Sequence, residues 1–90
     1  GGIRQVLHSK EGNLFLYLNY KDKTTVVAAR LASGARLVRS KNYFEEGTSS
    51  STEKHITMFG RWLVENGFNL GTWKTIDQKD LEELTPLALF

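Results

Sequence analysis

The chain has 90 residues, of which 40% are hydrophobic and 24% charged, and it contains no cysteine. This length and composition are typical of one globular domain. The lack of cysteine excludes disulfide scaffolds, thiolate chemistry and cysteine-ligated zinc. The sequence has no apolar run of about 18 residues, so it predicts no membrane-spanning helix. We expect a single domain over residues 1–90 in an intracellular compartment, cytoplasmic or nuclear, and the opening glycine pair suggests excision from a longer protein.

Charge is divided unequally between the two halves of the chain. Residues 1–45 hold eight Lys/Arg and three Asp/Glu, a net charge of +5, whereas residues 46–90 hold four and seven, a net charge of −3. The hydrophobic spacing changes at the same place, from strand-like alternation to the period of an amphipathic helix. The sequence therefore predicts an α+β domain in which a basic β half is joined to an acidic helical half.

The basic half predicts an antiparallel sheet of three or four strands within residues ~3–44. Its β-branched and aromatic runs are separated by turn residues, which gives candidate strands at 3–8, 14–20, 24–29 and 35–39. A helix over residues 25–32 is the open alternative, because the period of a short apolar run does not distinguish the two.

The two central strands predict a hairpin with apolar side chains on both of its faces. A three-residue turn at 21–23 would place Tyr20 opposite Thr24, Leu18 opposite Val26 and Leu16 opposite Ala28. Such a hairpin is either covered on both sides, or one side awaits a partner.

A long helix is predicted at 51–66. Ser50 and Glu53 have capping-box spacing, Asn66-Gly67 supplies a left-handed stop, and Phe68 follows where a hydrophobic contact closes the end. One arc of this helix carries the apolar side chains expected to face the sheet, namely His55, Ile56, Met58, Phe59, Trp62 and Leu63. Gly60 lies at the rim of that arc, where a small residue allows close approach.

The remaining C-terminal residues predict a connector and a short second helix. Residues 69–75 form the connector and hold Trp73, and a helix at ~77–85 begins near Asp77 and stops at Pro86. We expect this helix beside the first one, with one core formed by Leu14, Leu16, Leu18, Val26, Ile56, Phe59, Trp62, Leu63 and Leu81.

No residue pattern predicts catalysis, a cofactor or a metal. His8 and His55 lack a second ligand at metal spacing. The adjacent pairs Glu45-Glu46 and Glu82-Glu83 would diverge on a strand or a helix, so neither is an acid/base couple. We therefore expect a protein that is not an enzyme.

The basic residues of the β half favour nucleic-acid binding, because Lys and Arg neutralise phosphates and aromatic rings stack on unpaired bases. The expected surface lies on the sheet face that the helical layer leaves uncovered. Its candidate residues are Tyr17, Lys21, Lys23, Arg30, Arg36, Arg39, Lys41 and Tyr43. The alternative is a protein-interaction or oligomerisation domain that binds another subunit through apolar surface.

Overall fold

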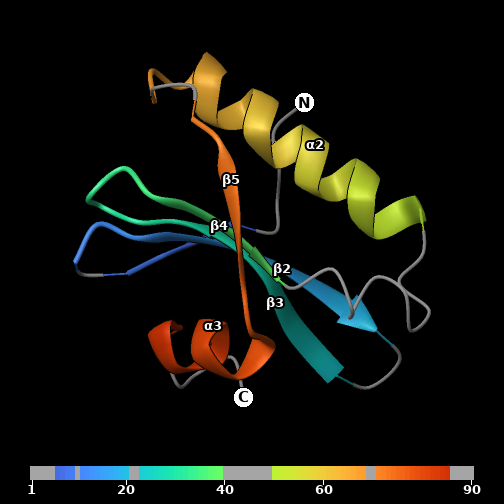
Figure 1. Cartoon of the computed structure of the whole chain (residues 1–90). Coiled ribbons are helices and arrows are strands. Elements are labelled where there is room, and N and C mark those ends of the chain that lie inside the picture. The colour runs from blue at the N-terminus through green and yellow to red at the C-terminus, as the bar shows by residue number, and fades with distance from the viewer. Residues whose placement is uncertain (1–5, 10, 21–22, 40–49, 69–70, 86–90) are drawn as a thin grey trace.

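The computed structural model describes residues 6–9, 11–20, 23–39, 50–68 and 71–85, which form a five-stranded sheet and two helices (Figure 1). The elements are β1 (Val6–His8), β2 (Leu14–Tyr20), β3 (Lys23–Arg30), β4 (Arg36–Arg39), α2 (Ser50–Glu65), β5 (Trp73–Ile76) and α3 (Gln78–Leu84). Helix α2 lies on one side of the sheet and α3 on the other. The predicted α+β class and both predicted helices are confirmed.

The sheet is mixed, so the prediction of a purely antiparallel sheet is wrong at one edge. Strands β1 to β4 are antiparallel neighbours, and β5 pairs in parallel with β4, from Arg36 opposite Trp73 to Arg39 opposite Ile76. Parallel neighbours require a long crossover connection, and here that connection carries α2. The segment predicted as a connector is therefore an edge strand over its last residues.

The β2–β3 hairpin differs in register from the prediction at its turn end. Leu16 pairs with Ala28 as expected, but Leu18 pairs with Thr25 and Tyr20 with Lys23. The cause is a β-bulge opposite Leu16 and Tyr17, where β3 carries one extra residue, Val27. Because residues 23–30 are a strand, the helical alternative for this part of the chain is wrong.

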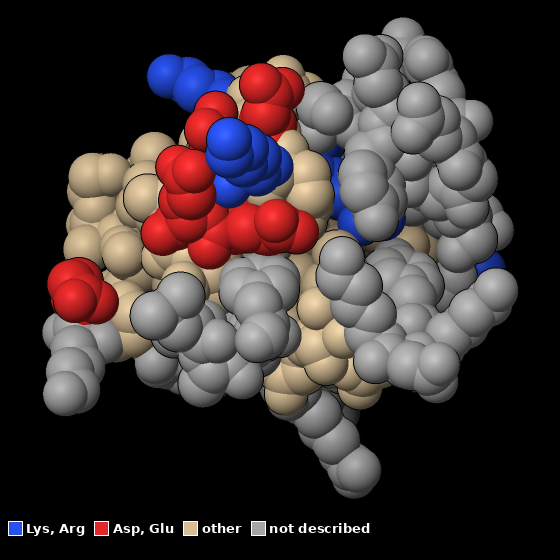
Figure 2. Space-filling view, turned by 90° about the horizontal axis from the view of Figure 1, so that it is seen from below, with Lys and Arg blue, Asp and Glu red and all other residues tan. Residues whose placement is uncertain are grey.

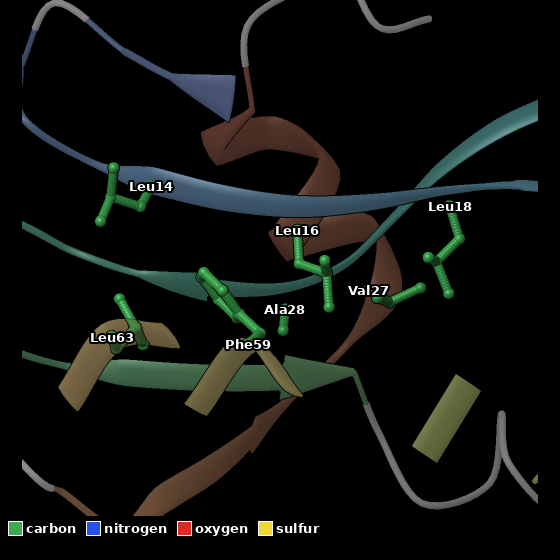
Figure 3. Close-up of a cluster of buried hydrophobic side chains, with 7 residues drawn as sticks. All are labelled: Leu14, Leu16, Leu18, Val27, Ala28, Phe59 and Leu63. Atoms are coloured by element: carbon green, nitrogen blue, oxygen red, sulfur yellow. The ribbon is translucent and has the colours of Figure 1, made fainter. Parts of the chain in front are cut away.

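The core is double, with one cluster on each sheet face. The α2 side holds the larger cluster, in which Phe59 and Leu63 of α2 pack on Leu14, Leu16, Leu18, Val27 and Ala28 (Figure 3). The other side holds Phe15, Val26, Ala29 and Leu81 of α3. The hairpin is therefore covered on both faces, and α3 lies across the sheet from α2 instead of beside it.

The C-terminal end of α2 is closed as its sequence predicts. Gly67 has a φ of +86°, and its N–H donates to the Val64 carbonyl at 3.1 Å. The Phe68 N–H donates to the Leu63 carbonyl at 2.9 Å, and the Phe68 ring stacks on Trp62 with centroids 6.3 Å apart. This pattern is a Schellman cap with its hydrophobic contact, and it turns the chain back toward β5.

Helix α3 is attached to the sheet by one apolar side chain and one polar one. Leu81 is fully buried, and Gln78 Nε2 donates to the Val26 carbonyl at 2.9 Å. Val26 lies next to the bulged residue, so Gln78 supplies a donor to a backbone group at the irregular part of the β2–β3 ladder.

Candidate functional site

The predicted nucleic-acid-binding residues differ in exposure. Tyr17 and Arg30 are half-buried, whereas Arg36 and Arg39 are only 3% and 1% exposed and have interaction partners within the chain. The remaining predicted residues lie outside what the structure describes, namely the side chain of Lys23 and the whole of Lys21, Lys41 and Tyr43. The expectation of accessible guanidinium groups at Arg36 and Arg39 is therefore wrong, because the fold packs over both side chains; Arg36, for example, lies against Trp73 and Gly71.

The sheet register separates Arg39 from the other two described arginines. Arg30 and Arg36 are direct cross-strand partners, and Arg36 is also opposite Trp73, which packs against the α2-side core. Arg39 is three residues further along β4 and opposite Ile76, which packs against the α3-side core. Since side chains alternate along a strand, the structure brings Arg30 and Arg36 together and places Arg39 on the other face.

Two aromatic rings that the sequence reasoning did not assign to a site complete an arginine–aromatic cluster, formed by Arg30, Arg36, Phe68 and Trp73. The Arg30 guanidinium carbon lies 4.6 Å from the centroid of Phe68, and that of Arg36 lies 5.7 Å from the centroid of Trp73. Burial lowers the pKa of Arg36, and the positive charge of Arg30 lowers it further. The only signal in the sequence was that Phe68 and Trp73 lie on either side of Gly71, shortly after the helix.

A continuous set of ring contacts supports this cluster from behind. Trp62 stacks on Phe68 and on Phe59, with centroids 6.3 Å apart in each pair, and Phe59 lies 6.0 Å from Trp73. Trp73 passes close to Gly60, where an added Cβ would lie 3.8 Å from the indole ring. The close approach predicted at Gly60 is confirmed, and it fixes the ring beneath Arg36.

The solvent-facing side of α2 carries a shallow groove that is largely open to solvent. Its lining residues are Glu53, Lys54, Thr57, Met58 and Arg61, and its volume is ≈ 440 Å³. Met58 is 49% exposed, so its predicted place on the core-facing arc is wrong. The reason is geometric, since Met58 lies about 100° around the helix from the fully buried Phe59 and so falls beyond the edge of the sheet-facing arc. We call Lys54, Thr57, Met58 and Arg61 the α2 stripe.

Helix α3 presents a different surface to solvent. Figure 2 shows acidic side chains gathered on this side of the molecule. Asp77, Asp80 and Glu83 are exposed there, with Lys79 among them and Leu84 43% exposed. In the part of the chain that the structure describes, no group of three or more His, Asp or Glu side chains is placed to hold a metal, and no helix is long and apolar enough to cross a membrane.

Comparison of the chain with protein-family models, with curated proteins and with solved structures finds no match. The candidate sites therefore rest on geometry and charge.

Proposed function

We propose that the chain is a non-catalytic protein-interaction module that binds an acidic partner helix through the α2 stripe. The observation that carries the proposal is the groove itself, in which an exposed methionine lies between two cations. Met58 is four residues after Lys54 and three before Arg61, so the three side chains share one face of α2. Methionine and arginine are both enriched at protein interfaces.

The chemistry of the groove defines the partner. An amphipathic helix that places an apolar side chain on Met58 and carboxylates on either side would meet Lys54 and Arg61 with opposite charge. Glu53 at one end of the groove would repel a carboxylate there, which favours one orientation of the partner.

Nucleic acid is the less favoured partner on the described surface. The arginines of β4 are buried, and the α2 stripe is followed by the exposed Glu65 as well as preceded by Glu53. A phosphate backbone needs several accessible cations, and base stacking needs an accessible aromatic platform. The exposed large apolar side chains among the described residues are Met58, Val64 and Leu84, which are aliphatic.

A fluorescence anisotropy titration tests the proposal with three labelled probes. These are a Glu/Leu amphipathic helical peptide, the same peptide with Lys for Glu, and a single-stranded oligonucleotide, each at low and high salt. We expect that only the acidic peptide, of the three probes, binds to the chain. The double variant Lys54→Gln/Arg61→Gln should weaken it by about tenfold, roughly 1.4 kcal/mol.

The matched control is Lys79→Gln, which removes an exposed cation from α3 and should leave the affinity unchanged. Equal affinity of the double variant and the wild type would reject the α2 stripe as the site. Binding of the oligonucleotide but not of the acidic peptide, with a steep loss at high salt, would instead assign a nucleic-acid-binding function.

A further inference from the structure

The outer surface of α3 has the chemistry that the α2 stripe requires of its partner. Asp80 and Leu84 are both exposed and stand four residues apart, so a carboxylate and an aliphatic side chain are neighbours on one flank of α3. Asp77 and Glu83 add further exposed carboxylates to this surface. Lys79 comes five residues before Leu84 and so lies about 140° around the helix from it, away from that flank. The chain therefore contains an acidic helix with an exposed apolar side chain.

The α2 stripe and this surface of α3 cannot meet within one copy, because the two helices lie on opposite sides of the sheet (Figure 1). We propose that α3 of one copy of the chain docks on the α2 stripe of a second copy. This inference rests on the function proposed for the α2 stripe, and it identifies the acidic partner helix as α3 of another copy.

The two surfaces match in charge and in spacing. Contact between Leu84 and Met58, which are 43% and 49% exposed, would remove two aliphatic side chains from water. Asp80 lies about 6 Å along its helix from that contact, and the cations of the α2 stripe lie about 6 Å before and about 4.5 Å after it. Asp80 would thus meet a cation whichever way α3 runs along α2. Glu53 at one end of the groove favours the direction in which Asp80 meets Arg61.

The positions of the two surfaces make the association head-to-tail. When one α2–α3 contact joins two rigid copies, the second α2 stripe and the second α3 are left on the outer sides of the pair, so a symmetric dimer cannot make both contacts. A heterologous contact of this kind continues into chains or closes into rings. The contact is small, because α3 has 7 residues and the groove is shallow, so we expect a Kd of about 10⁻⁴ M.

Sedimentation velocity of the whole chain tests the proposal between about 10 μM and about 1 mM, a range that spans this Kd. The weight-average sedimentation coefficient of the wild type should rise with concentration beyond that of a dimer, and high salt should reduce the rise. Lys54→Gln/Arg61→Gln should weaken the association about tenfold. Asp80→Asn/Leu84→Ala should weaken it by about the same factor. The matched control is Glu11→Gln, which removes an exposed carboxylate far from both surfaces in sequence and should associate as the wild type does.

A mixture of the two double variants tests the head-to-tail geometry directly. Each variant keeps one of the two surfaces, so the mixture has one intact contact and should form a 1:1 dimer that grows no further. The proposal is overturned by a wild type that stays monomeric over the whole range, by wild-type association of either double variant, or by a mixture that forms no dimer. If the substitutions release α3, the wild type decides: on dilution, amide resonances of residues 54–61 and 80–84 must both shift.

Failure of this inference differs from failure of the proposed function. If the acidic helical peptide binds the α2 stripe while the wild type stays monomeric, the function stands and α3 is not the partner. If the peptide does not bind and the wild type stays monomeric, both proposals are rejected. If both proposals hold, the acidic peptide should compete with α3 and return the associated wild type to monomer.

Discussion

The two faces of the sheet are covered by helices of unequal size. Helix α2 has 16 residues and contributes Phe59 and Leu63 to a core that also packs Trp62, Trp73 and Phe68, whereas α3 has 7 residues and one fully buried side chain, Leu81. A helix as short as α3 is not stable by itself. The difference indicates that the α2 layer supports the domain and that the α3 layer depends on it.

The outer surfaces of the two helices differ as well. The α2 stripe presents Lys54 and Arg61 around Met58, whereas α3 presents Asp77, Asp80 and Glu83. The net negative charge of the second half of the sequence is therefore concentrated on the smaller helix. The second half of the sequence, which is acidic as a whole, therefore forms two different surfaces on opposite sides of the sheet: the α2 stripe, which carries cations, and the acidic surface of α3.

The largest expected effect comes from breaking the α2 layer. Phe59→Ala should lower the free energy of unfolding by about 4 kcal/mol, through lost burial and the cavity left among the rings. Urea denaturation followed by tryptophan fluorescence measures it. The control is Met58→Ala, which changes the adjacent side chain that is 49% exposed. This variant should change the free energy of unfolding by less than about 0.5 kcal/mol. Equal losses in the two variants would show that the α2 layer does not carry the stability.

Breaking the α3 layer should have a smaller effect that stays local. Leu81→Ala should cost about 2–3 kcal/mol, and it should release α3 while β1 to β4 and α2 remain folded. Amide hydrogen exchange measures this as lost protection in residues 78–84 only. Leu84→Ala, which changes a 43% exposed leucine of the same helix, should leave exchange as in the wild type. Loss of protection throughout the sheet would mean that the two layers are equally essential.

Two glycines of the α2 layer should respond to alanine in opposite directions. Gly60→Ala should stabilise by about 0.5–1 kcal/mol, because it raises helix propensity and the new Cβ would meet Trp73 at an ordinary contact distance of 3.8 Å. Gly67→Ala should destabilise by about 1 kcal/mol, because that residue has a φ of +86°. Thermal melting of both variants checks the signs. A destabilised Gly60→Ala would mean that the helix does not accommodate a Cβ against Trp73 at this position.

The sequence was sufficient for elements whose signals are local. The end of α2 follows from Asn66-Gly67-Phe68, and the β2–β3 hairpin follows from its β-branched and aromatic runs. The predicted register of this hairpin was wrong near the turn. The position of a β-bulge depends on how both faces of the sheet pack, and the sequence of one strand does not contain that information.

Strand β5 could not be recognised because its two buried contacts lie on opposite faces of the sheet. Trp73 packs on the α2-side core and Ile76 on the α3-side core, with exposed Lys74 and Thr75 between them. This spacing of three breaks the period of two on which strand recognition depends. The arginines of β4 have the same spacing, so their burial on different faces was hidden in the sequence for the same reason.

The parallel pairing of β5 with β4 has a consequence for the order of folding. Strands β1 to β4 are joined by short connections, whereas β5 reaches β4 only after the whole α2 crossover, so we expect β5 to dock late. Until then β4 is an open edge, and its terminal residues Arg36 and Arg39 oppose pairing with another chain. Pulse-labelling hydrogen exchange during refolding would show β2 and β3 protected before β5; simultaneous protection would contradict this order. Arg36 and Arg39, which are buried in the folded domain, would thus be exposed during folding and would disfavour intermolecular strand pairing at the edge of the incomplete sheet.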